Sequence, residues 1–169
     1  MSDREEFIKD LRDAEDSDSH SRRGAFVRQI LAPTDLTSDS KNAVDYAIAF
    51  ARATGARVTL HHVHESSLGP DYVFGRNDYG EEDGYRADAE KALRQLRDEY
   101  KGQHVLVDTS YSVGVLWEEV ANIATELEAD IIIVSTHSYN WVNHLFEGSD
   151  AERMVRRASC PVLVVPEGF

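Results

Sequence analysis

Apolar residues follow two different spacings along the chain, and segments of the two kinds alternate. Runs of consecutive apolar, mostly β-branched residues predict strands at residues 26–32, 57–64, 104–109, 131–134 and 161–165. Apolar residues three and four positions apart predict helices between these runs, over residues 44–51, 89–100, 116–127 and 151–158. We expect the last helix to bury Ala151, Met154, Val155 and Ala158, and Cys160 to be buried before the last strand. This order predicts an α/β domain, a parallel sheet with helices on both faces and right-handed crossovers.

Local signals mark the ends of two of these helices. Ser38 or Ser40 is placed to cap the first helix, and Gly55 is a natural residue to follow its last turn. Before the last helix, Ser149 is followed three residues later by Glu152, which is the spacing of a capping box. A helix that starts after a buried strand also offers backbone N–H donors to an anion.

Two segments lack a regular period. Residues 65–85 contain four glycines and a proline, and they predict a long loop. Its aromatic residues Tyr72, Phe74, Tyr79 and Tyr85 could cover a ligand, and a mobile acidic loop is the alternative.

Residues 1–24 carry eight acidic and five basic residues with a weak apolar stripe. We expect a partly flexible N-terminal extension there, either a disordered tail or a segment that docks on a partner subunit. We expect a single domain over residues 25–169.

Composition narrows the function classes. With 18 Lys and Arg against 31 Asp and Glu, the net charge is −13, which argues against nucleic acid or an acidic membrane as the main partner. The single cysteine, Cys160, excludes an internal disulfide. No apolar leader or long apolar run is present, so a cytoplasmic location is expected.

The histidines of residues 57–64 do not predict a metal site. His62 and His64 share one face of the predicted strand, while His61 points to the other face. Because no third ligand follows at a fixed spacing, no metal is expected.

Candidate chemistry gathers at the carboxyl ends of the predicted strands, where a doubly wound sheet binds ligands. Pro33, Thr34 and Asp35 follow the first strand, and a polar loop from Ser135 to Gly148 follows the fourth. Asp35 has an alternative as a turn or capping residue. The chain lacks a Walker phosphate loop, a dinucleotide fingerprint and a nucleophile elbow.

The segments ILAPTD, LHHVHE and VSTHSYNWVNHLFEGSDAERMVRRASCPVLVVP resemble the universal stress protein family over residues 26–166. The resemblance implies an open, Rossmann-like five-stranded parallel sheet of order 3-2-1-4-5 with a crevice between the first and fourth strands. It also implies a homodimer formed through Pro161–Val165 and an adenine nucleotide, ATP or AMP, with or without Mg²⁺.

The resemblance also assigns roles to particular residues. Asp35 would contact the ribose and phosphate side, and the backbone of Val63 would read adenine. The phosphates would be held around Ser135, Ser138, Gly148 and Ser149. The full implied site comprises Pro33, Thr34, Asp35, Val63, Val134, Ser135, His137, Ser138, Gly148, Ser149 and Asp150.

Two departures from the family pattern keep other functions open. Ser135 and Ser138 replace two of the three glycines of the phosphate motif, although the Ser135 hydroxyl could point at phosphate oxygens. One alternative is a nucleotide-free dimeric interaction protein with a degenerate phosphate site. Another is a slow Mg²⁺-dependent ATPase that uses Asp35 and Asp150. No positioned base or phosphate-loop Lys is evident, so any turnover is expected to be slow.

Overall fold

The computed structural model describes residues 27–65, 79–135 and 150–166, with backbone only for residues 79–83, 150–152 and 154. Strands and helices alternate throughout, as the sequence predicts. They are β1 Gln29–Pro33, α2 Ser38–Thr54, β2 Arg57–His64, α3 Tyr79–Glu99, β3 Leu106–Val113, α4 Leu116–Glu126, β4 Ile131–Ser135, α5 Asp150–Arg157 and β5 Val162–Val165.

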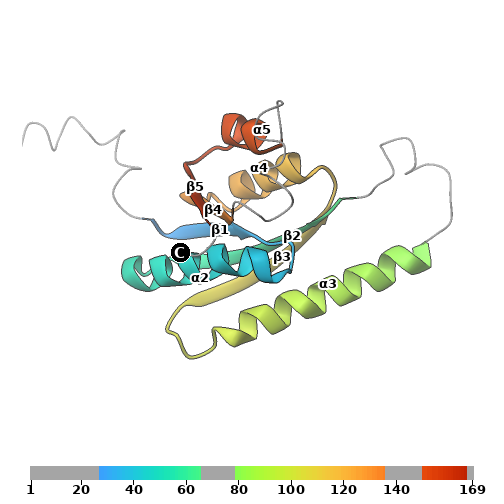
Figure 1. Ribbon diagram of the computed structural model, residues 1–169, viewed down its shortest axis with the longest axis horizontal. Helices are drawn as coiled ribbons and strands as arrows, with labels where there is room; N and C mark the ends of the chain where they lie inside the picture. The colour runs from blue at the N-terminus through green and yellow to red at the C-terminus, as the bar shows by residue number, and fades with distance from the viewer. Residues whose placement is uncertain (1–26, 66–78, 136–149, 167–169) are drawn as a thin grey trace, which may run out of the picture.

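The five strands form one parallel sheet of order β3-β2-β1-β4-β5, which confirms the expected α/β fold and strand order. Helices α2 and α3 cover one face of the sheet, and α4 and α5 cover the other (Figure 1). The first and fourth strands lie side by side in the middle, so the direction of winding reverses between them.

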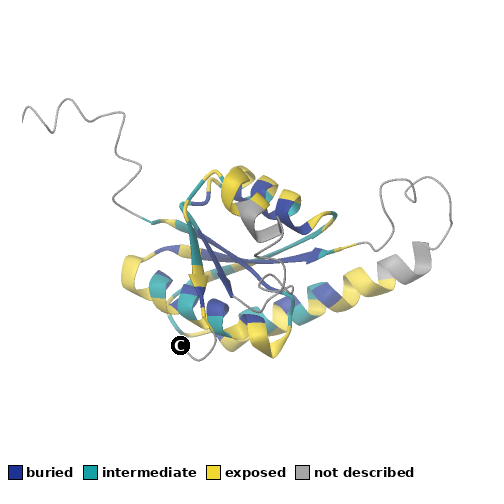
Figure 2. Cartoon of the chain, turned by 45° about the horizontal axis from the view of Figure 1, so that its top comes forward, coloured by how far each residue is buried: buried dark blue, intermediate teal, exposed yellow. Residues whose placement is uncertain are grey.

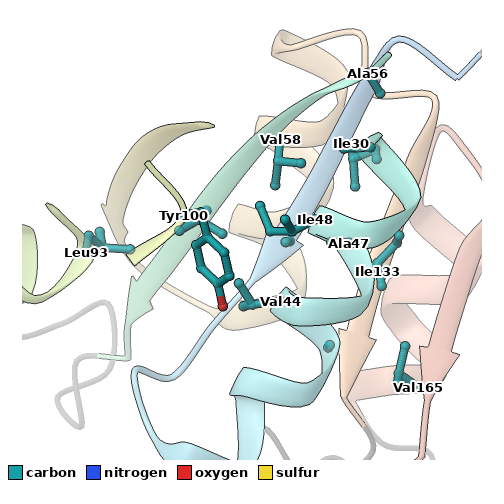
Figure 3. Close-up of a cluster of buried hydrophobic side chains, with 14 residues drawn as sticks. Ile30, Val44, Ala47, Ile48, Ala56, Val58, Leu93, Tyr100, Ile133 and Val165 are labelled. Carbon is teal, nitrogen blue, oxygen red and sulfur yellow. The ribbon is translucent and has the colours of Figure 1, made fainter. Parts of the chain in front are cut away.

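Each face of the sheet has its own apolar core, and the helices turn their exposed sides outward (Figure 2). The core under α2 includes Ile30, Val44, Ile48, Val58 and Ile133, shown in Figure 3. The core under α4 includes Leu31, Leu116, Val120 and Ile132. Side chains from β1 alternate between the two cores, as expected for a central strand that is buried on both faces.

Three predicted boundaries were wrong. The first strand begins at Gln29 rather than residue 26, and the third spans Leu106–Val113 rather than residues 104–109. Every residue of β3 pairs with a residue of β2, so tertiary pairing, which local pattern does not reveal, extends the strand. Helix α3 begins at Tyr79, so the last seven residues of the predicted 65–85 loop are helical. Gly80 and Gly84 disfavour a helix locally, which is why the sequence pattern did not predict this start.

The first residue of α2 is set by a cap that the sequence prediction missed. The cap is Thr37, whose backbone is extended and whose hydroxyl accepts from the N–H of Asp39 at 3.3 Å; it is neither Ser38 nor Ser40. At the other end Gly55 has the left-handed conformation expected of a residue that ends a helix. The capping box at Ser149 lies outside the described residues.

Helix α5 differs from its predicted packing. Ala158 lies in the core under α4, but Val155, which was predicted to be buried, is 57% exposed. Val164 of the neighbouring edge strand β5 is 49% exposed. Cys160, which was expected to be buried, is half-buried, and burial raises the pKa of its thiol. No helix in the described ranges is both long and apolar enough to cross a membrane.

Candidate functional site

The carboxyl ends of β1 and β4 meet at the first turn of α2, and this is where the structure brings several of the expected site residues together. Pro33 ends β1 and Ser135 ends β4. Thr34 and Ser135 are fully buried, whereas Asp35 is half-buried. A crevice at this reversal point is where ligands bind in open parallel sheets.

A chain of hydrogen bonds fixes the turn from β1 into α2. The N–H of Leu36 donates to Thr34 Oγ1 at 3.1 Å, and the Thr34 and Ser40 hydroxyls lie 2.8 Å apart. Ser40 Oγ donates to the carbonyl of Thr37 at 3.0 Å. Since that uses the single proton of Ser40, the Thr34 hydroxyl must be the donor between the two. The buried polar groups of this turn therefore satisfy one another.

The Asp35 carboxylate is part of the same turn. Its Oδ1 accepts from the N–H of Thr37 at 2.9 Å and from the Thr37 hydroxyl at 2.6 Å. This confirms the turn-forming role that was the alternative for Asp35. Leu36, between them, has a φ of 65°, a left-handed conformation that is unfavourable for a leucine. Such strain is typical of functional turns, and no feature of the sequence signals it.

Ser135 has a different role from the one expected. Its hydroxyl donates to the carbonyl oxygen of Asp39, in the first turn of α2, at 3.0 Å. A hydroxyl has a single proton, so in this arrangement it does not donate to a phosphate. The side chain that replaces the first glycine of the phosphate motif instead joins the end of β4 to α2.

Val63 lies near the crevice on its β2 side. Its side chain is buried in the core under α4, together with Leu116 and Val134. Pro33, the last residue of β1, pairs with His61, so β2 runs three residues beyond the end of β1. The backbone around Val63 therefore extends past the end of β1.

The remaining expected site residues are not placed. His137, Ser138, Gly148 and Ser149 lie outside the described residues. Asp150 is the first residue of α5, and its side chain is not described. The phosphate side of the crevice therefore stays a prediction.

The three histidines of β2 point as expected. His61 lies on the α4 side of the sheet, where burial, and secondarily His62, lowers its pKa to about 4. His62 lies on the α3 side, where burial lowers its pKa and the hydrogen bond to Thr34 partly offsets this. Both are therefore neutral at pH 7. In the part of the chain that the structure describes, no three metal-ligating side chains converge.

His62 contacts Thr34, at the end of β1, and the sequence did not indicate this contact. Its Nδ1 lies 2.8 Å from the carbonyl oxygen of Thr34, and its Nε2 lies 3.3 Å from the hydroxyl of Tyr85 on α3. Only the strand alternation, which places His62 on the α3 face, could have pointed to this role. The contacts therefore join three parts of the chain: the turn after β1, strand β2 and helix α3.

A shallow cavity of about 320 Å³ lies away from the crevice, lined by Arg52, Gly102, Gln103 and His104. It adjoins the end of α2 and lies near the amino ends of the strands, opposite the carboxyl ends that form the crevice. None of the expected site residues lines it.

The fold and the crevice together define a doubly wound α/β protein whose ligand site would lie between β1 and β4. A model of the universal stress protein family matches residues 27–166. The chain belongs to the universal stress protein family.

Individual relatives agree with this assignment. Universal stress protein A homolog 1 of Coxiella burnetii is 31% identical over 145 residues, which cover 82% of this chain and 95% of the relative. The solved structure of MJ0577, a Methanocaldococcus jannaschii protein, has a TM-score of 0.71 at 24% identity and covers 86% of this chain and 99% of its own.

A third similar protein is a universal stress protein family protein of Arabidopsis thaliana, solved with AMP bound. Its TM-score is 0.57 at 14% identity, with 82% of this chain and 91% of the other covered. At such identities the two structural matches establish a shared fold.

Proposed function

We propose that this protein binds an adenine nucleotide, ATP or AMP, in the crevice between β1 and β4 and acts as a binding module in the cytoplasmic stress response. The observation that carries the proposal is the meeting of the Thr34–Asp35 turn, the end of β4 and the start of α2 at the point where the sheet reverses. Membership of the family and the AMP-bound Arabidopsis relative support it.

The proposed roles follow the crevice from its floor outward. Pro33, Thr34 and Val134 form the buried floor, and the Asp35 carboxylate faces the ribose. The backbone of Val63 recognises adenine. The phosphates lie along His137, Ser138, Gly148, Ser149 and the start of α5 at Asp150, where N–H groups and the helix dipole favour an anion.

Calorimetric titration with ATP and AMP, each with and without Mg²⁺, tests the proposal. We expect saturable heat at physiological nucleotide concentrations. Absence of heat for both nucleotides would remove the proposal. A requirement for Mg²⁺ would indicate that a cation offsets the Asp150 carboxylate beside the phosphates.

Two variants of Asp35 separate its charge from its turn. Asp35→Asn keeps an oxygen that accepts from the Thr37 N–H, whereas Asp35→Ala removes both the charge and the turn bonds. If the carboxylate contacts the ribose, Asp35→Asn should weaken AMP binding about tenfold or more, at unchanged stability. Full affinity in Asp35→Asn with loss only in Asp35→Ala would mean that the residue acts through the turn alone.

A nucleotide-free interaction protein is the second candidate, and the bond from Ser135 to Asp39 favours it. In this case the Ser135 hydroxyl bonds within the protein instead of binding a ligand, and the serines that replace two glycines abolish phosphate binding. Ser135→Gly and Ser138→Gly distinguish the two candidates. Under nucleotide binding each variant should retain or strengthen ATP affinity, while under this alternative binding appears only when the glycines are restored.

A slow Mg²⁺-dependent ATPase is the third candidate, with the cation held by Asp35 and Asp150. Phosphate release measured over hours, compared between wild type and Asp35→Asn, tests it. We expect no turnover that depends on Asp35, because the sequence shows no base positioned to activate a water molecule.

We also propose a homodimer formed through β5, with residues 1–24 as an extension outside the domain. The edge position of β5 and the exposed Val155 and Val164 support pairing of two copies. In analytical ultracentrifugation, Val164→Lys should shift the protein to monomer, whereas Leu106→Lys, at the opposite exposed edge, should not. An unchanged dimer in Val164→Lys would argue for another interface.

A further inference from the structure

Helix α3 makes its first described contacts with the sheet through polar and aromatic side chains. Tyr85, 44% exposed, packs against His64 with ring centroids 4.0 Å apart and ring planes tilted by 34°, and the Arg86 guanidinium lies 5.6 Å from the ring centre of Tyr111. Among side chains that the structure describes, the first buried residue of α3 is Ala89. Among the described side chains that precede Ala89, Tyr85 and Arg86 therefore provide the attachment of α3 to the sheet.

His62 connects this attachment to the crevice. A carbonyl oxygen can only accept, so the 2.8 Å contact with Thr34 requires a proton on Nδ1 of His62. Burial keeps the ring neutral by lowering its pKa, so Nε2 carries a lone pair. The Tyr85 hydroxyl, 3.3 Å away, therefore donates to Nε2. The bonds run in one direction, from Tyr85 through His62 to Thr34.

Thr34 is the residue at which this series of hydrogen bonds reaches the proposed ligand site. Its hydroxyl binds Ser40 and accepts from the N–H of Leu36, which holds the strained turn that carries Asp35. Its N–H donates to the carbonyl of His61 at 2.8 Å, so β2 binds both the N–H and the carbonyl oxygen of Thr34. A displacement of His62 would therefore move the turn.

We propose that His62 and Tyr85 are positioning residues that couple the docking of the first half of α3 to the conformation of the Thr34–Asp35 turn. The coupling is a property of the ligand-free protein. By linkage, a ligand that favours the docked form of the turn also stabilises the docked form of α3, and a partner that holds α3 raises the affinity of the crevice. This second part rests on the proposed function. Under this proposal, α3 is the surface element whose docking changes when a ligand binds in the crevice.

The competing view is that His62 is a packed core residue with incidental contacts. Three substitutions separate the two views, because two of them remove the bond between Tyr85 and residue 62, one from each end, and the third removes the bond to Thr34. Tyr85→Phe removes only the hydroxyl and keeps the ring on His64. In His62→Asn the amide replaces Nδ1 and nothing reaches Tyr85, whereas in His62→Gln the amide replaces Nε2 and nothing reaches Thr34.

The first experiment uses the full-length, ligand-free protein. Amide hydrogen exchange of residues 84–92 should quicken about fivefold in Tyr85→Phe and in His62→Asn, since one net hydrogen bond is lost, and stay close to wild type in His62→Gln. Tyr100→Phe is the matched control: its hydroxyl binds Asp45 at the other end of α3, so it should leave residues 84–92 unchanged.

Coupling requires that the effect crosses to the turn. In Tyr85→Phe the amide resonances of Asp35 and Leu36 should shift, although the substitution lies on another element and preserves the aromatic ring. The ¹⁵N spectrum of wild-type His62 should show the tautomer with the proton on Nδ1. Unshifted Asp35 and Leu36 amides, or the opposite tautomer, would overturn the proposal.

The second experiment adds AMP. Exchange of residues 84–92 should slow on AMP binding in wild type, and this response should be lost in Tyr85→Phe. If calorimetry detects binding of neither ATP nor AMP, the proposed function fails while the ligand-free result stands. If AMP binds and exchange in α3 does not respond in wild type, the coupling of ligand to α3 fails while nucleotide binding stands.

Discussion

Helices α2 and α3 lie on the same face of the sheet but are held in different ways. Within its 17 residues α2 buries Ser40, Ala43, Val44, Ala47, Ile48 and Ala51, and its first turn is fixed by the Thr37 cap and the bond from Ser135. Helix α3 has 21 residues, and its described side chains bury only Ala89 and Leu93. Helix α2 buries a full stripe of side chains, whereas α3 reaches the core in its described part mainly through Leu93 and Leu96, with polar contacts at Tyr85 and near its last turn.

The two attachments of α3 also differ from each other. Near its last turn, Glu99 forms an ion pair with Lys41 of α2, and Tyr100, just beyond, donates to Asp45 of α2 at 2.7 Å. In its first half, Tyr85 reaches the crevice through His62. Helices with few buried contacts open at lower free energy than core helices, so the first half of α3 is suited to respond to a ligand.

The largest effect is expected in the core under α2. Ile48→Ala should lower the free energy of unfolding by roughly 2–5 kcal/mol, and Ile48→Val by roughly 0.5–1.5 kcal/mol, because Ile48 is fully buried and the cavity grows with each lost methyl group. Urea unfolding at constant m-value measures both. A cost of Ile48→Ala below about 1 kcal/mol would contradict the description of α2 as part of the core.

Acid should lower the stability of the fold more through His61, on the α4 side of the sheet, than through His62 on the α3 side. The pKa of His61 falls from 6.5 in the unfolded chain to about 4 in the fold, so the unfolded state binds the proton first. Stability from this residue is complete above pH 6.5 and decreases until about pH 4, by an amount on the order of 3 kcal/mol.

The matched control for this acid effect is His61→Gln, which does not titrate. Stability should fall less steeply in the variant than in wild type between pH 6.5 and 4, as measured by urea unfolding at each pH. Parallel curves would contradict a buried neutral His61. The corresponding effect of His62 should be smaller, because the α3 side can open locally.

The attachment at the end of α3 should contribute less. Tyr100→Phe should cost about 1.5 kcal/mol, since it removes a hydrogen bond to a carboxylate and keeps the buried ring. Burial and the neighbouring Asp45 raise the pKa of Tyr100, so a spectrophotometric titration should find this tyrosine among the last to ionise. Ionisation of Tyr100 near pH 10 would show that the contact with Asp45 does not form in solution.

The smallest of these effects is expected at the first turn of α2. Thr37→Ala should cost about 1 kcal/mol, because it removes the cap on the Asp39 N–H and the bond to Asp35. Thr37→Ser keeps the hydroxyl and should restore most of this stability. If Ser40→Ala rather than Thr37→Ala destabilised the start of the helix, the cap would have been assigned to the wrong residue.

Local pattern predicted the fold well, because each strand and helix has a hydrophobic period of its own. The run Ile131–Val134 and the α2 stripe that includes Val44, Ile48 and Ala51 are legible without knowledge of the fold. Gly55 marked the end of α2 because few other residues adopt its left-handed φ of 76° at low cost. The order of the strands came from the resemblance to the family rather than from periodicity.

The errors arose where contacts distant in sequence decide. Pairing with β2 extends β3 to Val113, and Val155 was assigned to the core although its position on α5 leaves it exposed. Of the candidate site, Pro33, Thr34, Asp35, Val134 and Ser135 do lie together at the ends of β1 and β4. The direction of the Ser135 hydroxyl was not predictable, because its acceptor lies on α2, 96 residues away in the chain.

The sequence by itself determined the alternation of strands and helices, the acidic charge and the family, because these follow from periodicity, composition and motif spacing. Only the tertiary structure decided that Ser135 binds α2 and that His62 joins α3 to the turn at Thr34. The physical reason is that a hydrogen bond depends on the position of both partners. Side chains from β1, β2, β4, α2 and α3 become neighbours only once the sheet has assembled.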